Sequence, residues 1–160
     1  MIFYSANKTE LIRLLPLEAG RVAGEVGRWC FLPGKFMQWL AIALGGALGS
    51  VLRFAAVSYL TPLLNHRFPI GTFIVNLSGS FLIGVAYVLL VEKTTLPAEW
   101  RLFFITGILG SYTTFSAFSL EILQLWQEGH VVNAFFYASS SVVLGLLMAF
   151  IGMALTQKLF

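Results

Sequence analysis

Residues 110–121 read GSYTTFSAFSLE and fall where the third of four apolar segments would cross a membrane. A bilayer core offers no water to polar groups, so a spanning segment is normally apolar and unbroken. This stretch instead places hydroxyl side chains around Phe115 and Phe118 and ends on the carboxylate of Glu121. Such residues are tolerated at membrane depth only where they face other protein or a water-filled path. The stretch therefore predicts a functional site inside a membrane protein.

Composition and hydropathy predict the fold class. The 160 residues are 58% hydrophobic and only 11% charged, with a mean hydropathy of +0.85, whereas soluble domains carry roughly 25% charged residues. Crossing a bilayer as a helix takes about 20 residues. The apolar runs are continuous and lack the alternation of a β-barrel. They predict an all-α integral membrane protein with four spans, the third of them broken. The spans are expected at about 37–60, 70–91, 102–126 and 131–155.

The amino-terminal 36 residues differ from the predicted four-helix domain, 37–160. They hold five of the ten basic residues, and part of them has the pattern of a short amphipathic surface helix. We interpret 1–36 as an extension that is either dispensable or not translated, with Met37 as the alternative start. Without it, three basic residues on one side of the membrane (Lys93, Arg101 and Lys158) oppose two on the other (Arg53 and Arg67). So weak a bias predicts insertion in both orientations.

Several classes of function are excluded by residue content. The single cysteine, Cys30, cannot form a disulfide within the chain or build a zinc-finger site. The two histidines, His66 and His130, lack partners at metal-ligand spacing. The scattered basic residues form no patch that would bind nucleic acid. No nucleophile, base and orienting acid converge at usable spacing, so an enzyme is not expected.

Polar residues recur at every fourth position on two predicted helices and therefore share one face of each. The rows are Thr72, Asn76 and Ser80 on the second helix, and Tyr137, Ser141 and Gly145 on the fourth. One such row can simply join two helices, at about 0.6–2 kcal/mol per hydrogen bond. Together with the hydroxyls of the third helix, the rows predict a shared polar path.

The first predicted helix has small residues at Gly45 and Gly49, a spacing that lets two helix backbones approach closely, and helix packing is the favoured interpretation. Arg53 follows on the same stripe. An arginine on an apolar span is costly, so it marks either an ion pathway or the end of the helix. Both alternatives place a positive charge near a membrane entrance.

A helix break is predicted near Gly110, Thr113 and Thr114, because these residues favour helix poorly. Backbone carbonyls freed inside a membrane protein need a partner, which a bound cation or a second subunit would supply. Phe115 and Phe118 lie among the hydroxyls, where their electropositive ring edges can meet an anion.

Three motifs in order, GGALGSVLRF (45–54), PIGTFIVNLSGSFLIG (69–84) and GILGSYTTFSAFSLE (107–121), carry a resemblance to a known family. From Met37 on, the chain resembles the CrcB or Fluc family of fluoride channels. The resemblance implies passive, fluoride-selective export across a bacterial inner membrane by an antiparallel, dual-topology homodimer with a structural sodium ion at its centre. Two positions depart from the pattern, namely Ala117 where members often have threonine and Gly145 where a hydroxyl is sometimes found.

The resemblance also implies a role for each matching residue. Arg53 lies at an aqueous vestibule, Asn76 donates to fluoride, and Phe115 and Phe118 are the paired pore phenylalanines. Gly110 and Thr113 give backbone carbonyls to the sodium ion. The remaining matches form a polar track for the ion: Thr114, Ser116, Glu121, Tyr137 and Ser141.

Two other functions compete with a channel. A proton-coupled exporter of the small multidrug-resistance type is also small, four-helical and of dual topology, but it needs a carboxylate in its first helix. The first span has only Arg53, and Glu121 lies toward the end of the third. A purely structural membrane subunit would leave the polar rows unexplained.

Overall fold

The computed structural model describes residues 33–63 and 68–160. The chain divides into two compact units, Met1–Trp39 and Leu40–Phe160. In the first unit the described residues, 33–39, are helical. The predicted surface helix of the extension, together with Cys30, His66 and Arg67, lies outside the described residues.

The described parts of the chain form helices and no strand, as predicted. In chain order these are α2 (Pro33–Leu63), α3 (Ile70–Tyr87), η1 (Val88–Glu92), α4 (Ala98–Arg101), η2 (Leu102–Leu109), α5 (Gly110–Tyr112), α6 (Phe115–Gln127) and α7 (Val131–Leu159). The η segments are π-helical, with wider turns than an α-helix. Four stretches are long and apolar enough to cross a membrane: Lys35–Pro62, Ile70–Glu92, Ala98–Gln127 and Val131–Leu159. The four predicted spans are thereby confirmed.

Turn residues delimit the last two spans. Pro97 precedes α4 in an extended conformation, with φ −51° and ψ 148°, which suits a proline at a helix start. Gly129 has φ +81° between α6 and α7, a left-handed conformation that glycine adopts without steric cost. The two helices can therefore reverse direction over a few residues.

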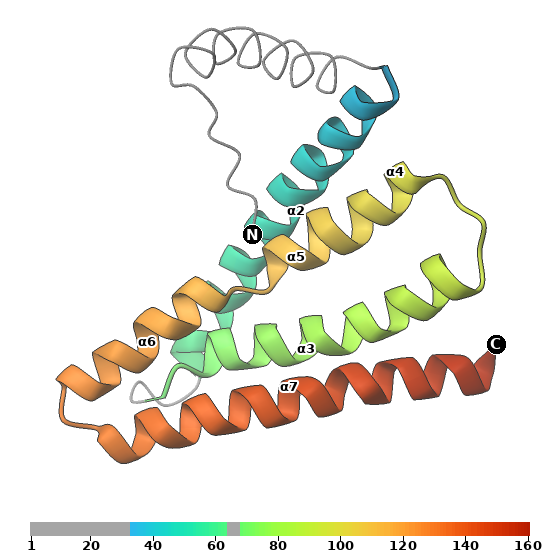
Figure 1. The fold of residues 1–160 in the computed structure, drawn as a ribbon. Coiled ribbons are helices and arrows are strands. Elements are labelled where there is room, and N and C mark those ends of the chain that lie inside the picture. The colour runs from blue at the N-terminus through green and yellow to red at the C-terminus, as the bar shows by residue number, and fades with distance from the viewer. Residues whose placement is uncertain (1–32, 64–67) are drawn as a thin grey trace, which may run out of the picture. The chain divides into compact units, whose positions relative to one another are not determined.

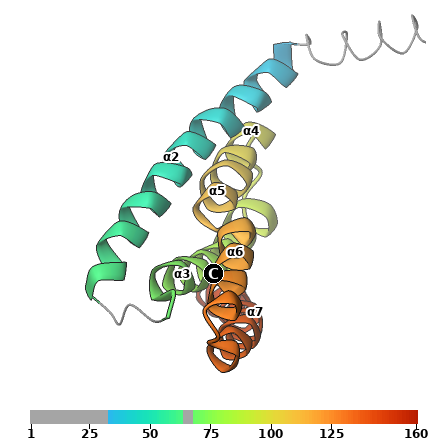
Figure 2. The same cartoon turned by 90° about the vertical axis from the view of Figure 1, so that its left-hand side faces the viewer.

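α3 and α7 lie side by side (Figures 1 and 2) and touch through glycines. A Cβ atom on Gly84 would collide with the carbonyl of Ala149, and one on Gly152 would collide with the carbonyl of Phe81. Backbone therefore meets backbone at both crossings, as small residues permit in membrane helices.

α2 meets the third span in the same way. A Cβ on Gly45 would collide with the carbonyl of Phe103, and one on Gly49 would collide with that of Ile108. Gly107 faces Gly45 across this contact. The packing interpretation of the Gly45–Gly49 pair is confirmed, and the contact fixes the half of the third span that precedes its break.

Candidate functional site

The third span is broken between α5 and α6. The helix stops at Tyr112, and the next two residues are extended, with ψ 149° at Thr113 and φ −145°, ψ 118° at Thr114. α6 then begins at Phe115 (Figure 1). The predicted break is confirmed, although Gly110 itself stays helical with φ −64° and ψ −32°.

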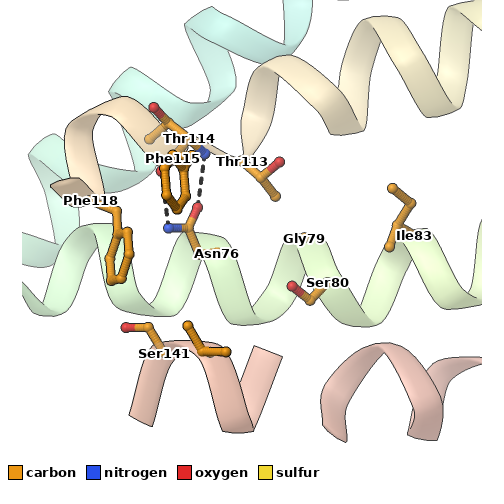
Figure 3. A pocket seen from close by; sticks show the side chains of 10 residues that line it. Asn76, Gly79, Ser80, Ile83, Thr113, Thr114, Phe115, Phe118 and Ser141 are labelled. Atoms are coloured by element: carbon orange, nitrogen blue, oxygen red, sulfur yellow. Dashed lines mark hydrogen bonds between the residues drawn. The ribbon is translucent and has the colours of Figure 1, made fainter. Parts of the chain in front are cut away.

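Asn76 on α3 forms hydrogen bonds with the backbone at the break. Its Oδ1 accepts from the Thr114 N–H at 2.9 Å, and its Nδ2 donates to the Thr114 carbonyl at 3.3 Å (Figure 3). The amide oxygen thus replaces the helical acceptor that the Thr114 N–H would have, and the amide N–H adds a bond to the carbonyl of this N-cap residue. At membrane depth no water can do this, so the polar side chain stabilises the extended backbone at Thr114.

The four carbonyls of residues 110–113 lose their usual helical donors at the break, because α5 ends at Tyr112 and α6 begins at Phe115. In a continuous helix Gly110 would accept from the N–H of Thr114, which instead donates to Asn76. Thr113 would accept from the N–H of Ala117, which instead donates to Thr114 Oγ1 at 3.3 Å. The carbonyls of Gly110 and Thr113 are therefore two of the four that lose a helical donor, and that of Ser111 accepts from the Arg53 side chain instead.

A cavity of about 270 Å³ lies beside the break, between α3, α6 and α7 (Figure 3). It brings together six of the predicted site residues, namely Asn76, Thr113, Thr114, Phe115, Phe118 and Ser141, with four others, namely Gly79, Ser80, Ile83 and Val142. No charged side chain lines it. Amide, hydroxyl and aromatic groups therefore share one space at membrane depth.

The hydroxyl of Ser141 is buried in this region without a hydrogen-bond partner among the described residues. Serines in membrane helices commonly donate to the carbonyl one turn back, as Ser119 does to Phe115 at 2.9 Å and Ser140 to Phe136 at 2.6 Å. A buried unpaired hydroxyl costs free energy of about 1–3 kcal/mol. The Ser141 hydroxyl is therefore available to donate to another group.

Phe115 and Phe118 differ in how far the chain covers them. Their ring centroids lie 5.7 Å apart, and the Phe118 ring lies 5.2 Å from that of Tyr137. Phe118 is only 7% exposed and belongs to the hydrophobic core, whereas Phe115 is 78% exposed. Phe118 is fixed by its neighbours, and Phe115 presents most of its ring outward.

Glu121 lies further along α6, in a hydrogen-bonded group of its own. Thr72 Oγ1 donates to its Oε1 at 2.5 Å, and the Tyr137 hydroxyl donates to its Oε2 at 2.6 Å. A second cavity of about 240 Å³ adjoins Glu121 and Thr72, and Gln124 and Glu128 also line it. The carboxylate thus links α3, α6 and α7 between the buried aromatic rings and a polar recess.

Arg53 on α2 lies at the other side of the break. Its Nε donates to the Ser111 carbonyl at 3.2 Å. Ser116 pairs with Thr114 through their hydroxyls, 3.2 Å apart. Neither cavity is lined by Gly110, Arg53 or Ser116. The predicted residues therefore lie in three places, namely around the cavity beside the break, around Glu121, and at the contact of Arg53 with the end of α5.

Residues outside the predicted site also belong to this arrangement. Thr72 and Ser80 belong to the row predicted on α3 but not to the predicted site, and their four-residue spacing from Asn76 is the signal that could place them there. Gly79 gave no signal in sequence, yet a Cβ on it would collide with Thr113 Cγ2. With the Thr113 and Tyr112 side chains placed as they are, a glycine at 79 lets the break lie against α3.

Comparisons with known proteins assign the family. The family model described as "CrcB-like protein, Camphor Resistance (CrcB)" matches residues 40–153. A relative from Saccharophagus degradans named "Fluoride-specific ion channel FluC" is 46% identical over 78% of this chain and 93% of its own length. Relatives of the same name from Acidobacterium capsulatum (42% identical, 77% of this chain, 98% of the relative) and Methylococcus capsulatus (44%, 77% and 54%) also match. The chain is a multi-pass membrane protein that belongs to the CrcB family.

Proposed function

We propose that the protein is a passive, fluoride-selective channel that lets fluoride leave the cytoplasm and so limits its toxicity. The observation that carries this proposal is the cavity beside the break, where the Asn76 amide, the unpaired Ser141 hydroxyl and the Phe118 ring meet without any charged lining residue. The name of the relatives supports the same function, and it describes a channel and not an enzyme.

The chemistry of the cavity suits a small anion. Fluoride is strongly hydrated, so it enters a membrane protein only where donors replace its water at each step. One N–H of the Asn76 amide is used by Thr114, which leaves the second for an ion. The Ser141 hydroxyl and the positive edges of the phenylalanine rings add weak donors. Neutral donors bind the ion without holding it as a full positive charge would, and conduction requires that it leave again.

Fluoride efflux from liposomes tests this function. Vesicles that contain the purified protein and are loaded with potassium fluoride should release fluoride when valinomycin lets potassium follow, as a fluoride electrode records. We expect release without ATP or a proton gradient, and no comparable release of chloride from chloride-loaded vesicles. Flux that requires a proton gradient would favour the exporter instead, and vesicles as tight as protein-free ones would overturn the proposal.

A sodium ion at the centre of the assembly is part of the proposal. The carbonyls of Gly110 and Thr113 suit it, because both lose their helical donors at the break. Neutral hard oxygen ligands favour a monovalent cation over a transition metal, and the described residues hold no cluster of three histidine, cysteine or acidic side chains. Protein prepared with potassium in place of sodium should carry less fluoride in the same vesicles and regain flux when sodium is added.

We also propose that two chains assemble antiparallel in a bacterial inner membrane. One chain leaves Phe115 78% exposed, and the two carbonyls that we propose as ligands, those of Gly110 and Thr113, are too few for a sodium ion. Dual insertion can be read from labelling. In cells that produce a Cys30→Ser variant carrying His130→Cys in the loop between α6 and α7, a membrane-impermeant thiol reagent should label about half of the chains from outside. Complete labelling, or none, would contradict the antiparallel arrangement.

A further inference from the structure

Ser80 lies one turn beyond Asn76 on α3 and lines the cavity beside the break. Figure 3 shows its side chain on the same stretch of helix as Asn76, toward α7. Its hydroxyl forms no hydrogen bond within the described part of the chain, unlike that of Ser78, which bonds the Val75 carbonyl at 3.1 Å. Ser80 is thus a second unpaired hydroxyl, beside that of Ser141, in the same cavity.

The position of Gly145 explains what this hydroxyl does. Gly145 follows Tyr137 and Ser141 at four-residue spacing on α7, so it continues their row but has no side chain. A Cβ built on Gly145 would meet only one atom, Ser80 Oγ, at 3.5 Å. The Ser80 hydroxyl therefore occupies the side of the cavity where α7 offers no polar group.

We propose that Ser80 is a fluoride-binding residue, which donates to the ion at the step where the α7 row is interrupted by Gly145. This inference rests on the proposed function. A dehydrated anion needs a donor at each step, and beyond Ser141 the row on α7 has none at its next position. Ser80 supplies it from the opposite helix. A role in joining α3 to α7 would require an acceptor for its proton, and the described residues provide none.

Two matched pairs of variants test the proposal in the liposome assay. Ser80→Thr keeps a hydroxyl, and Ser80→Val introduces a side chain with the shape of threonine but without the hydroxyl. We expect the first to keep fluoride efflux near the wild-type rate and the second to lower it about tenfold, the effect of one lost hydrogen bond to an ion. Ser80→Ala should show a similar loss, while Ser139→Ala, on the exposed side of α7, should show none.

The second pair moves the hydroxyl across the cavity. In the Ser80→Ala background, Gly145→Ser should restore most of the flux, because its side chain starts 3.5 Å from the place that Ser80 Oγ occupied. Gly145→Ala adds the same Cβ without a donor and should restore nothing. Equal rescue by both, or by neither, would overturn the proposal, as would equal flux in the Thr and Val variants. Wild-type vesicles that release no fluoride would instead contradict the channel itself.

Discussion

Asn76→Asp is expected to lower the rate of fluoride efflux at least about a hundredfold. The aspartate keeps an acceptor for the Thr114 N–H but loses the Nδ2 donor that serves the Thr114 carbonyl and, in our proposal, the ion. Two unit charges of like sign 4 Å apart repel by about 4 kcal/mol at an effective dielectric constant of 20. A hundredfold loss of rate takes only about 2.7 kcal/mol, so the repulsion of an anion by the carboxylate is sufficient. The initial rate in the liposome assay measures this.

Asn133→Asp is the matched control for this variant. Asn133 lies in the first turn of α7 and lines neither the cavity beside the break nor the recess at Glu121. We expect its flux to stay close to wild type, because a carboxylate near a helix amino terminus is favourable. Asn76→Ala adds a second readout, since it leaves the Thr114 N–H without its acceptor and should lower the thermal midpoint in detergent as well. Wild-type flux in Asn76→Asp would remove Asn76 from the ion path.

Phe115→Ile and Phe118→Ile are each expected to lower fluoride flux about tenfold or more, while the protein stays folded. An isoleucine keeps an apolar side chain but has no ring edge to present to an anion. The two variants should separate in stability. Phe118 packs against Tyr137 in the core, so its replacement should also cost about 1–3 kcal/mol of folding free energy. Phe115 is 78% exposed in the single chain, so its replacement should leave the thermal midpoint of the chain nearly unchanged.

Phe135→Ile controls for the loss of an aromatic ring as such. Phe135 is 69% exposed on α7 and lines neither of the two cavities at the site. Its flux and its thermal midpoint should both remain at wild-type values. If Phe115→Ile and Phe118→Ile behaved in the same way as Phe135→Ile, the two rings would serve packing alone.

The spans and the break could be predicted from sequence because each rests on local chemistry. Long uncharged runs must be helical in a bilayer, and a run of glycine and threonine weakens a helix wherever it occurs. Spacing also showed that Thr72, Asn76 and Ser80 share a face of α3. It could not show which helix that face meets, because the neighbour depends on how three spans pack together.

The partners of the polar residues were therefore beyond the sequence. The sequence predicts that Asn76 donates to an ion, and the structure shows that its Oδ1 and one of its two N–H groups bond the Thr114 backbone 38 residues away. Glu121 was assigned to the ion path, and its bond to Thr72 joins residues 49 apart. Such pairings depend on register between helices, which single-residue periodicity does not encode.

The glycine contacts of Gly45, Gly49 and Gly107 bear on the fluoride selectivity that we propose. Side chains adapt to a larger guest by changing rotamer, whereas main-chain atoms in contact have no rotamers to change. Where backbone rests on backbone, the half of the third span before the break can move only if a whole helix moves with it. A frame of this kind would admit the smallest halide and resist widening for a larger one, and the ratio of fluoride to chloride release in the vesicle assay is where such stiffness would be seen.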